Sequence, residues 1–160
     1  MSLTEILLSL VIMLVVVAGV AVNYATVKDR TDEQLLVQSV EMLRANIEQI
    51  YASESYTGIN NSVLTSAGVV PKGLLSGTSM KTRWGDVTVS DAEAGGYALT
   101  FQNLPPAACR TLAGLSTTSW NSVAVGETEL FSRAENTAVT PSDILSACSE
   151  AGNTLVFTGP

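Results

Sequence analysis

An uncharged apolar run near the amino terminus, residues 6–22, constrains the fold of this chain more than any other feature. It reads ILLSLVIMLVVVAGVAV, and Ser9 is its only polar side chain. As an α-helix the run would be about 25 Å long, close to the lower limit for crossing a bilayer. Because such a helix is apolar on every side, we expect it to lie in lipid or among other apolar helices.

A secretory signal peptide and a membrane anchor are the two ordinary interpretations of this run. No Lys or Arg precedes it, whereas a signal peptide begins with a basic region. Ala18, Ala21 and Ala25 could imitate a cleavage site, so the signal peptide remains an alternative. Lys28 and Arg30 follow the run, as is typical of a single membrane span, and we favour the anchor.

Glu5 is an acidic residue at the start of the apolar run. A carboxylate beside hydrocarbon is costly unless it is paired. The nearest basic side chain, Lys28, would lie about 35 Å away along a helix, which leaves the α-amino group of Met1 as the available cation. Glu5 therefore either stays among lipid headgroups at the positive end of the helix dipole, or pairs with the Met1 amine of an adjacent subunit.

The helical pattern continues beyond the apolar run. Apolar residues recur every three or four positions, at Leu36, Val40, Leu43, Ile47 and Ile50/Tyr51. This spacing predicts one helix from about Ser2 to about Ala52, about 75 Å long. We expect three segments: an apolar transmembrane and polymerisation half over 1–27, an amphipathic half over 28–53, and a globular α+β head over 54–160.

The head is predicted from short strands and proline-started helices. Strand propensity and alternation favour Val87–Val89, Tyr97–Gln102, Ser122–Val125 and Leu155–Thr158. We predict a turn over 91–96, a short helical turn at Ser62–Ser66, and helices that open at Pro105/Pro106 and at Pro141 and stop near Gly114 and Gly152. The predicted fold class is α+β, with a mainly antiparallel sheet against the apolar stripe of the long helix.

The composition argues against catalysis and against nucleic-acid binding. The chain has no His and carries 8 basic and 15 acidic residues, for a net charge of −7. This balance offers no basic surface for nucleic acid, and two Cys alone cannot hold a structural zinc ion. No phosphate-binding loop or nucleophile–base pair is recognisable. We therefore expect no cofactor, no metal and no enzymatic activity.

The two cysteines, Cys109 and Cys148, fall in the two predicted short helices of the head. In a domain exported past a membrane, one pair of cysteines indicates one disulfide. Closing a loop of about 40 residues would stabilise the head by about 4 kcal/mol. Two buried free thiols in a cytosolic protein are the alternative.

Several segments together resemble the type IV pilins. The start, MSLTEILLSLVIMLVVVAGVAV, resembles a mature pilin amino terminus, and Met1 and the paired cysteines resemble the type IVb subfamily. YTGINNSVL, GYALTFQNLPPAACRTL and TAVTPSDILSAC resemble bundle-forming pilins and the thin-pilus pilins of conjugative plasmids. The similarity covers essentially the whole chain.

This resemblance implies a fold, a processing route and site roles. The expected fold is the type IV pilin fold, with the Cys109–Cys148 disulfide bounding a surface-exposed region. Prepilin peptidase would cleave a basic leader before Met1, whose amine is then usually methylated. Subunits would wait in the inner membrane until the pilus assembly machinery packs them into an extracellular helical filament, with Glu5 pairing with a neighbour's Met1 amine.

Polymerisation also follows from the apolar run itself, since it is equally stable in lipid and in the dry centre of a helix bundle. Ser9, Ala18, Gly19 and Ala21 are small residues that would allow close helix packing. We expect the major subunit of a homopolymeric type IVb pilus that serves adhesion, aggregation or conjugative contact. A minor pilin, a secretion pseudopilin and a membrane-anchored ligand-binding domain are the alternatives.

Overall fold

The chain folds into two compact units, residues 1–35 and residues 36–160. The computed structural model describes residues 2–52, 54–93, 95–114 and 120–160, with the backbone alone for 19–31. Helix α1 (Leu3–Ile50) starts in the first unit and ends in the second, which confirms the single long helix predicted from the apolar spacing. Within the described ranges, no helix is both long enough and apolar enough to cross a bilayer.

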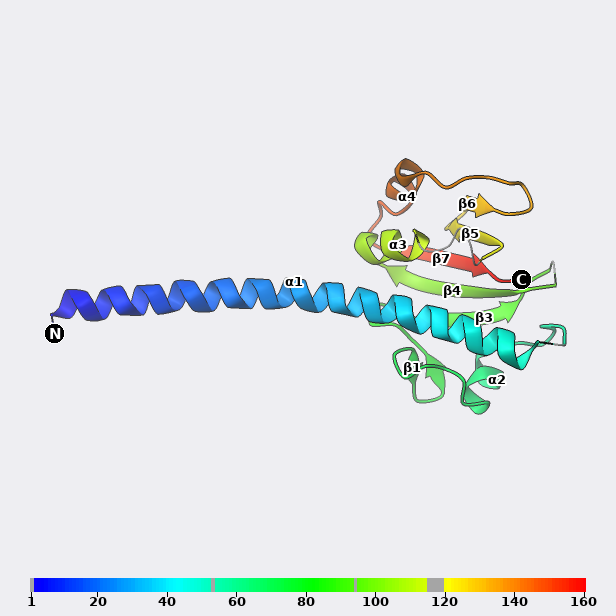
Figure 1. Ribbon diagram of the computed structural model, residues 1–160, viewed down its shortest axis with the longest axis horizontal. Helices are drawn as coiled ribbons and strands as arrows, with labels where there is room; N and C mark the ends of the chain where they lie inside the picture. Colours follow the sequence, from blue (N-terminus) through cyan, green and yellow to red (C-terminus); the bar gives the residue numbers. More distant parts are fainter. Residues whose placement is uncertain (1, 53, 94, 115–119) are drawn as a thin grey trace. The chain divides into compact units, whose positions relative to one another are not determined.

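The second unit is an α+β domain built around an antiparallel sheet (Figure 1). Its strands lie in the order β3-β4-β7-β5-β6, and every neighbouring pair is antiparallel. The separate pair β1-β2 forms a second, two-stranded sheet. After α1 the elements are α2 (Asn61–Ser66), β1 (Leu75–Ser76), β2 (Ser79–Met80), β3 (Val87–Asp91), β4 (Tyr97–Leu104), α3 (Pro106–Ala113), β5 (Ser122–Val125), β6 (Thr128–Ser132), α4 (Pro141–Ala147) and β7 (Asn153–Thr158).

The amphipathic part of α1 supplies one side of the core. Leu36, Val40, Leu43 and Ile47 are buried together with the inward-facing residues of β4 and β7, so the predicted stripe is confirmed over these four positions. At the fifth predicted position, Ile50/Tyr51, Tyr51 is the residue that packs partly buried against the core, whereas Ile50 is 43% exposed at the point where the helix ends.

A charged and aromatic cluster holds α1 against the sheet within the second unit. Arg44 forms ion pairs with Glu41 (3.4 Å) and Glu48 (3.3 Å), and its guanidinium lies 5.7 Å from the centre of the buried Trp120 ring. The Tyr97 hydroxyl of β4 donates a hydrogen bond to Glu48 (3.4 Å). Ion pairs and hydrogen bonds require a defined geometry. These contacts therefore fix the rotation of α1 about its axis and its position along the sheet more closely than apolar packing alone would.

The short helices start where local sequence caps them. The Asn60 side chain accepts a hydrogen bond from the Val63 amide at the start of α2, and Thr140 does the same for the Asp143 amide at the start of α4. Proline occupies the first turn of α3 and of α4, where its missing N–H costs nothing. These ends agree with the predicted ones, and α3 is followed by Gly114 as expected.

Three strands and one helix end were predicted incorrectly. The sequence prediction omits β1, β2 and β6, and it extends the last helix to Gly152, whereas α4 ends at Ala147. Strand β6 has no clean alternation, because a bulge opposite β5 makes Leu130, Phe131 and Ser132 consecutively buried. It forms because the Gly126–Glu127 turn, with Gly126 at φ +60°, folds it back onto β5.

Candidate functional site

Residues 3–17 of the first unit form a helical surface that is mostly apolar. The large hydrophobic side chains over residues 3–17 are each 46–77% exposed, from Ile6 at 46% to Leu3 at 77%. The set is Leu3, Ile6, Leu7, Leu8, Leu10, Val11, Ile12, Met13, Leu14, Val15, Val16 and Val17. Soluble single-chain proteins rarely expose contiguous apolar surface of this extent, and such a surface is typical of an interaction site.

Glu5 takes part in capping its own helix. Its Oε2 accepts a hydrogen bond from the Ser2 backbone N–H (3.3 Å), and the Ser2 carbonyl accepts from the Glu5 amide (3.1 Å). The Ser2 and Thr4 hydroxyls are hydrogen-bonded at 2.9 Å. Ser2 and Glu5 have the spacing of a capping box, in which an acidic third residue reaches back to the helix start. This S-x-x-E spacing is visible in the sequence, and the prediction for Glu5 did not include it.

The four predicted helix-packing residues all belong to α1. Ser9 is exposed, and its hydroxyl donates to the Glu5 carbonyl (3.0 Å), so it is satisfied within the helix. Ala18 is exposed on α1. Gly19 and Ala21 belong to the helical backbone of α1, and their surroundings lie outside the described side chains. Met1 lies outside the described residues, so its pairing with Glu5 stays a prediction.

The cysteine prediction is confirmed. Cys109 of α3 and Cys148, which follows α4, form a disulfide with a Cα–Cα separation of 5.7 Å. Both residues are fully buried. The bond therefore ties α3 and α4 together and bounds the part of the head that carries β5 and β6.

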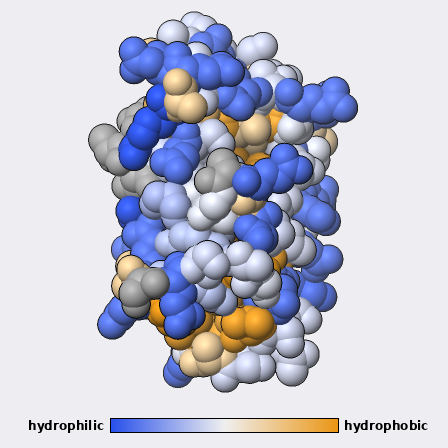
Figure 2. Space-filling view, turned by 90° about the vertical axis from the view of Figure 1, so that its right-hand side faces the viewer, coloured by the Kyte–Doolittle hydropathy of each residue, from blue (hydrophilic) through white to orange (hydrophobic). Residues whose placement is uncertain are grey.

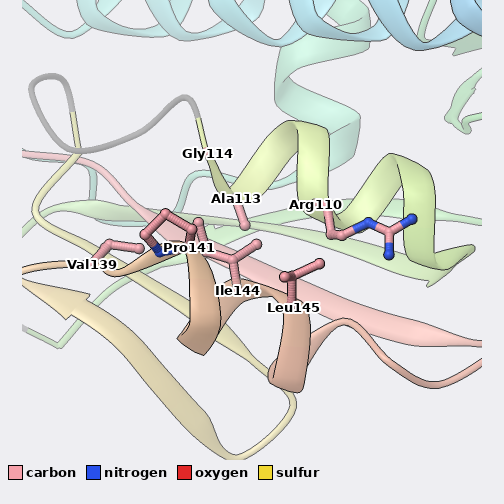
Figure 3. Close-up of a pocket in the computed structure, with 7 residues that line it drawn as sticks. All are labelled: Arg110, Ala113, Gly114, Val139, Pro141, Ile144 and Leu145. Carbon is pink, nitrogen blue, oxygen red and sulfur yellow. The ribbon is translucent and has the colours of Figure 1, made fainter.

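An apolar groove lies between these two helices (Figure 3). Ala113 contributes to it from α3, and the side chains of Pro141, Ile144 and Leu145 of α4 face that helix. Arg110 lies at one end of the groove, and Leu145 is 54% exposed beside it. Sequence analysis did not find this groove, because no periodic pattern indicates that two short helices will meet.

The chemistry available in the described part of the chain is that of association. In these residues no three His, Cys, Asp or Glu side chains gather in a way that could hold a metal ion. The two tyrosines with shifted pKa values, Tyr97 and Tyr56, lie in the core or pack against it. Burial is the larger cause that raises each pKa, and the nearby Glu48 carboxylate is the second. A phenol with a raised pKa stays neutral and serves as a hydrogen-bond donor here, which suits a structural contact.

The exposed apolar helix and the disulfide-bounded α+β head define a pilin-like subunit, and comparisons with known proteins specify the family. Residues 30–159 match the family model described as PilS N terminal, and the chain belongs to this family. The predicted type IVb pilin class and its α+β fold are thereby confirmed.

Individual relatives agree with this assignment. The major structural subunits of the bundle-forming pilus of Escherichia coli O111:H- and of E. coli O127:H6 (strain E2348/69 / EPEC) are 27% and 28% identical to the chain. Each alignment covers 96% of this chain and 89% of the relative. The crystal structure of a type IVb pilin from Salmonella typhi superposes with a TM-score of 0.59 at 19% identity, over 75% of this chain and 94% of that chain. These relatives are structural subunits, which agrees with the prediction that this chain is not an enzyme.

Proposed function

We propose that this chain is the major subunit of an extracellular type IVb pilus, a homopolymer whose core is formed by the apolar half of α1. The observation that carries the proposal is the exposure of the apolar side chains over residues 3–17. Burying one Leu, Ile, Val or Met side chain gains about 1.5–3 kcal/mol, so packing these helices against one another stabilises a filament strongly. The names of the two E. coli relatives support the same role.

We further propose that the apolar run lies in the inner membrane before assembly, after prepilin peptidase has removed a leader and Met1 has been methylated. Its support is the 17-residue uncharged run over 6–22 and the basic residues Lys28 and Arg30 that follow it. Transfer from lipid into a filament of like helices keeps these side chains out of water throughout. The pilus assembly machinery would carry out that transfer.

Glu5 is the proposed determinant of subunit addition, through its pairing with the Met1 amine of a neighbouring copy. The same carboxylate also caps its own helix, so the test must separate the two roles. Glu5→Gln does so, because glutamine at this helical position can still accept the Ser2 N–H hydrogen bond but carries no charge.

The experiment compares surface filaments by electron microscopy in cells that produce wild type, Glu5→Gln or Ser2→Ala. Inner-membrane levels of each subunit are measured by fractionation. We expect Glu5→Gln to accumulate in the membrane without filaments, and Ser2→Ala, which retains the backbone N–H, to assemble normally. Normal filaments from Glu5→Gln would overturn the pairing role. Absence of filaments from wild type would overturn the proposed function.

A further inference from the structure

The groove between α3 and α4 combines an apolar wall with an uncompensated positive charge. It encloses about 480 Å³ and is lined by Ala113, Val139, Pro141, Ile144 and Leu145, with Arg110 at one end (Figure 3). Among the described residues, no acidic side chain forms an ion pair with Arg110. The chain has 15 acidic and 8 basic residues, so basic groups are the scarcer kind. A basic group without an acidic partner in its own chain is available to pair with an acidic group of another molecule.

The end of α1 offers the complementary surface. Ile50 is 43% exposed at the last helical position, and Glu54, four residues further on, is exposed and forms no ion pair within the described part of the chain. Of the other exposed large hydrophobic residues of the second unit, Leu145 lies in the groove itself, with Asp143 two positions before it, and the remaining three lack such a neighbour. Met42 follows Glu41, which already pairs with Arg44, and Val63 and Leu75 have no acidic residue within eight positions in sequence.

These two surfaces lie toward opposite ends of the second unit. Tyr97, the first residue of β4, is hydrogen-bonded to Glu48 near the end of α1. Strand β4 then runs for 8 residues, about 25 Å, before α3 begins at Pro106. Figure 1 shows the same arrangement, with α3 and α4 at one end of the sheet and the end of α1 at the other. Figure 2 views the face at the end of α1, which is mostly hydrophilic, with hydrophobic side chains gathered near its lower edge.

We propose that the α3–α4 groove receives the end of α1 from a second copy of this chain, with Ile50 against Ile144 and Leu145 and with Glu54 paired with Arg110. A contact that joins different surfaces of two copies repeats from copy to copy without closing, as a helical filament requires. It would join the second units of neighbouring copies, separately from the Glu5 contact. This inference rests on the proposed polymerisation, and its test is read out against wild-type filaments.

Charge exchange tests the ion pair. Cells producing Arg110→Glu, Glu54→Arg, or both changes together are compared for the amount of sheared surface filament. Lys72→Glu is the matched control, because it makes the same charge change at an exposed residue outside the groove. We expect each single variant to lose at least tenfold in filament yield, and the double variant to regain most of it. Lys72→Glu should remain at the wild-type level.

Crosslinking tests proximity independently of charge. In filaments carrying both Ile50→Cys and Leu145→Cys, mild oxidation should give a ladder of disulfide-linked multimers on non-reducing gels, whereas each single variant should give dimers at most. The native cysteines are already bonded to each other and buried. If wild type forms filaments, but the double-cysteine filaments give no ladder and the double charge variant shows no rescue, the inference is overturned and the proposed function stays intact. Recovery of filament yield in the double charge variant, without a disulfide ladder from the double-cysteine variant, would also reject the Ile50 contact. Absence of filaments from wild type would reject the proposed function instead.

Discussion

Asn61 protects the outer edge of the sheet, and its removal is the sharpest test of how the head is held together. Strand β3 is an edge strand, hydrogen-bonded to β4 on one side only. On its other side the Asn61 side chain donates to the Val87 carbonyl (2.9 Å) and accepts from the Val89 amide (2.7 Å). The amide therefore occupies the place of a neighbouring strand, and it also ties α2 to the sheet.

Asn61→Ala removes both bonds at once. Each hydrogen bond contributes about 1 kcal/mol net, and the backbone groups left without a partner add to the loss, so we expect the free energy of unfolding to fall by about 2–3 kcal/mol. Asn60→Ala is the matched control. It removes the cap bond from the Val63 amide (3.0 Å) and a longer, exposed bond to the Gly58 carbonyl (3.3 Å), and should cost about 1 kcal/mol.

The assay is urea unfolding of the full chain in nonionic detergent, followed by tryptophan fluorescence. Trp120 is 1% exposed, so its emission changes when the head unfolds. The midpoint should shift for both variants without a change in the urea dependence. If Asn61→Ala costs no more than Asn60→Ala, water replaces the amide at the strand edge and the argument for edge protection fails.

Three further predictions concern the stability of the second unit. Replacing Cys109 and Cys148 together by Ala should lower the free energy of unfolding by about 4 kcal/mol, because the bond closes a loop of 39 residues; a loss below about 1 kcal/mol would contradict this. Burial raises the pKa of Tyr97 above the ordinary 10.0, so the unfolded state releases that proton first and stability should fall as pH rises above about 10. Tyr97→Phe should flatten this alkaline decline, and an unchanged slope would refute the assignment. Arg44→Met should lower the thermal midpoint, since it leaves Glu48 without its cation.

The long helix and the α+β class could be predicted because their causes are local. The spacing of Leu36, Val40, Leu43 and Ile47 determines which face of α1 is buried, and proline and capping residues determine where α3 and α4 begin. The disulfide followed from two cysteines and an exported location. Each of these signals lies within a few neighbouring residues or a single residue type.

The rest depends on contacts between segments far apart in the sequence. Strand β6 is set by a bulge opposite β5, and the α3–α4 groove by two helices that a disulfide brings together. The double hydrogen bond of Asn61 spans 26 and 28 residues, so no local pattern indicates it. The capping role of Glu5 has a local signal, the S-x-x-E spacing of Ser2 and Glu5, which an interpretation based on the charge of Glu5 alone does not use.

A reconstruction of the purified filament by electron cryomicroscopy tests most directly whether the apolar half of α1 is an assembly core. In the isolated chain Leu3, Met13 and Leu14 are 77%, 70% and 69% exposed. We predict that in the filament these side chains lie near the axis, packed among helices of other copies, with their exposure reduced nearly to zero. A filament in which residues 3–17 face solvent, while the heads alone hold the subunits together, would contradict the account.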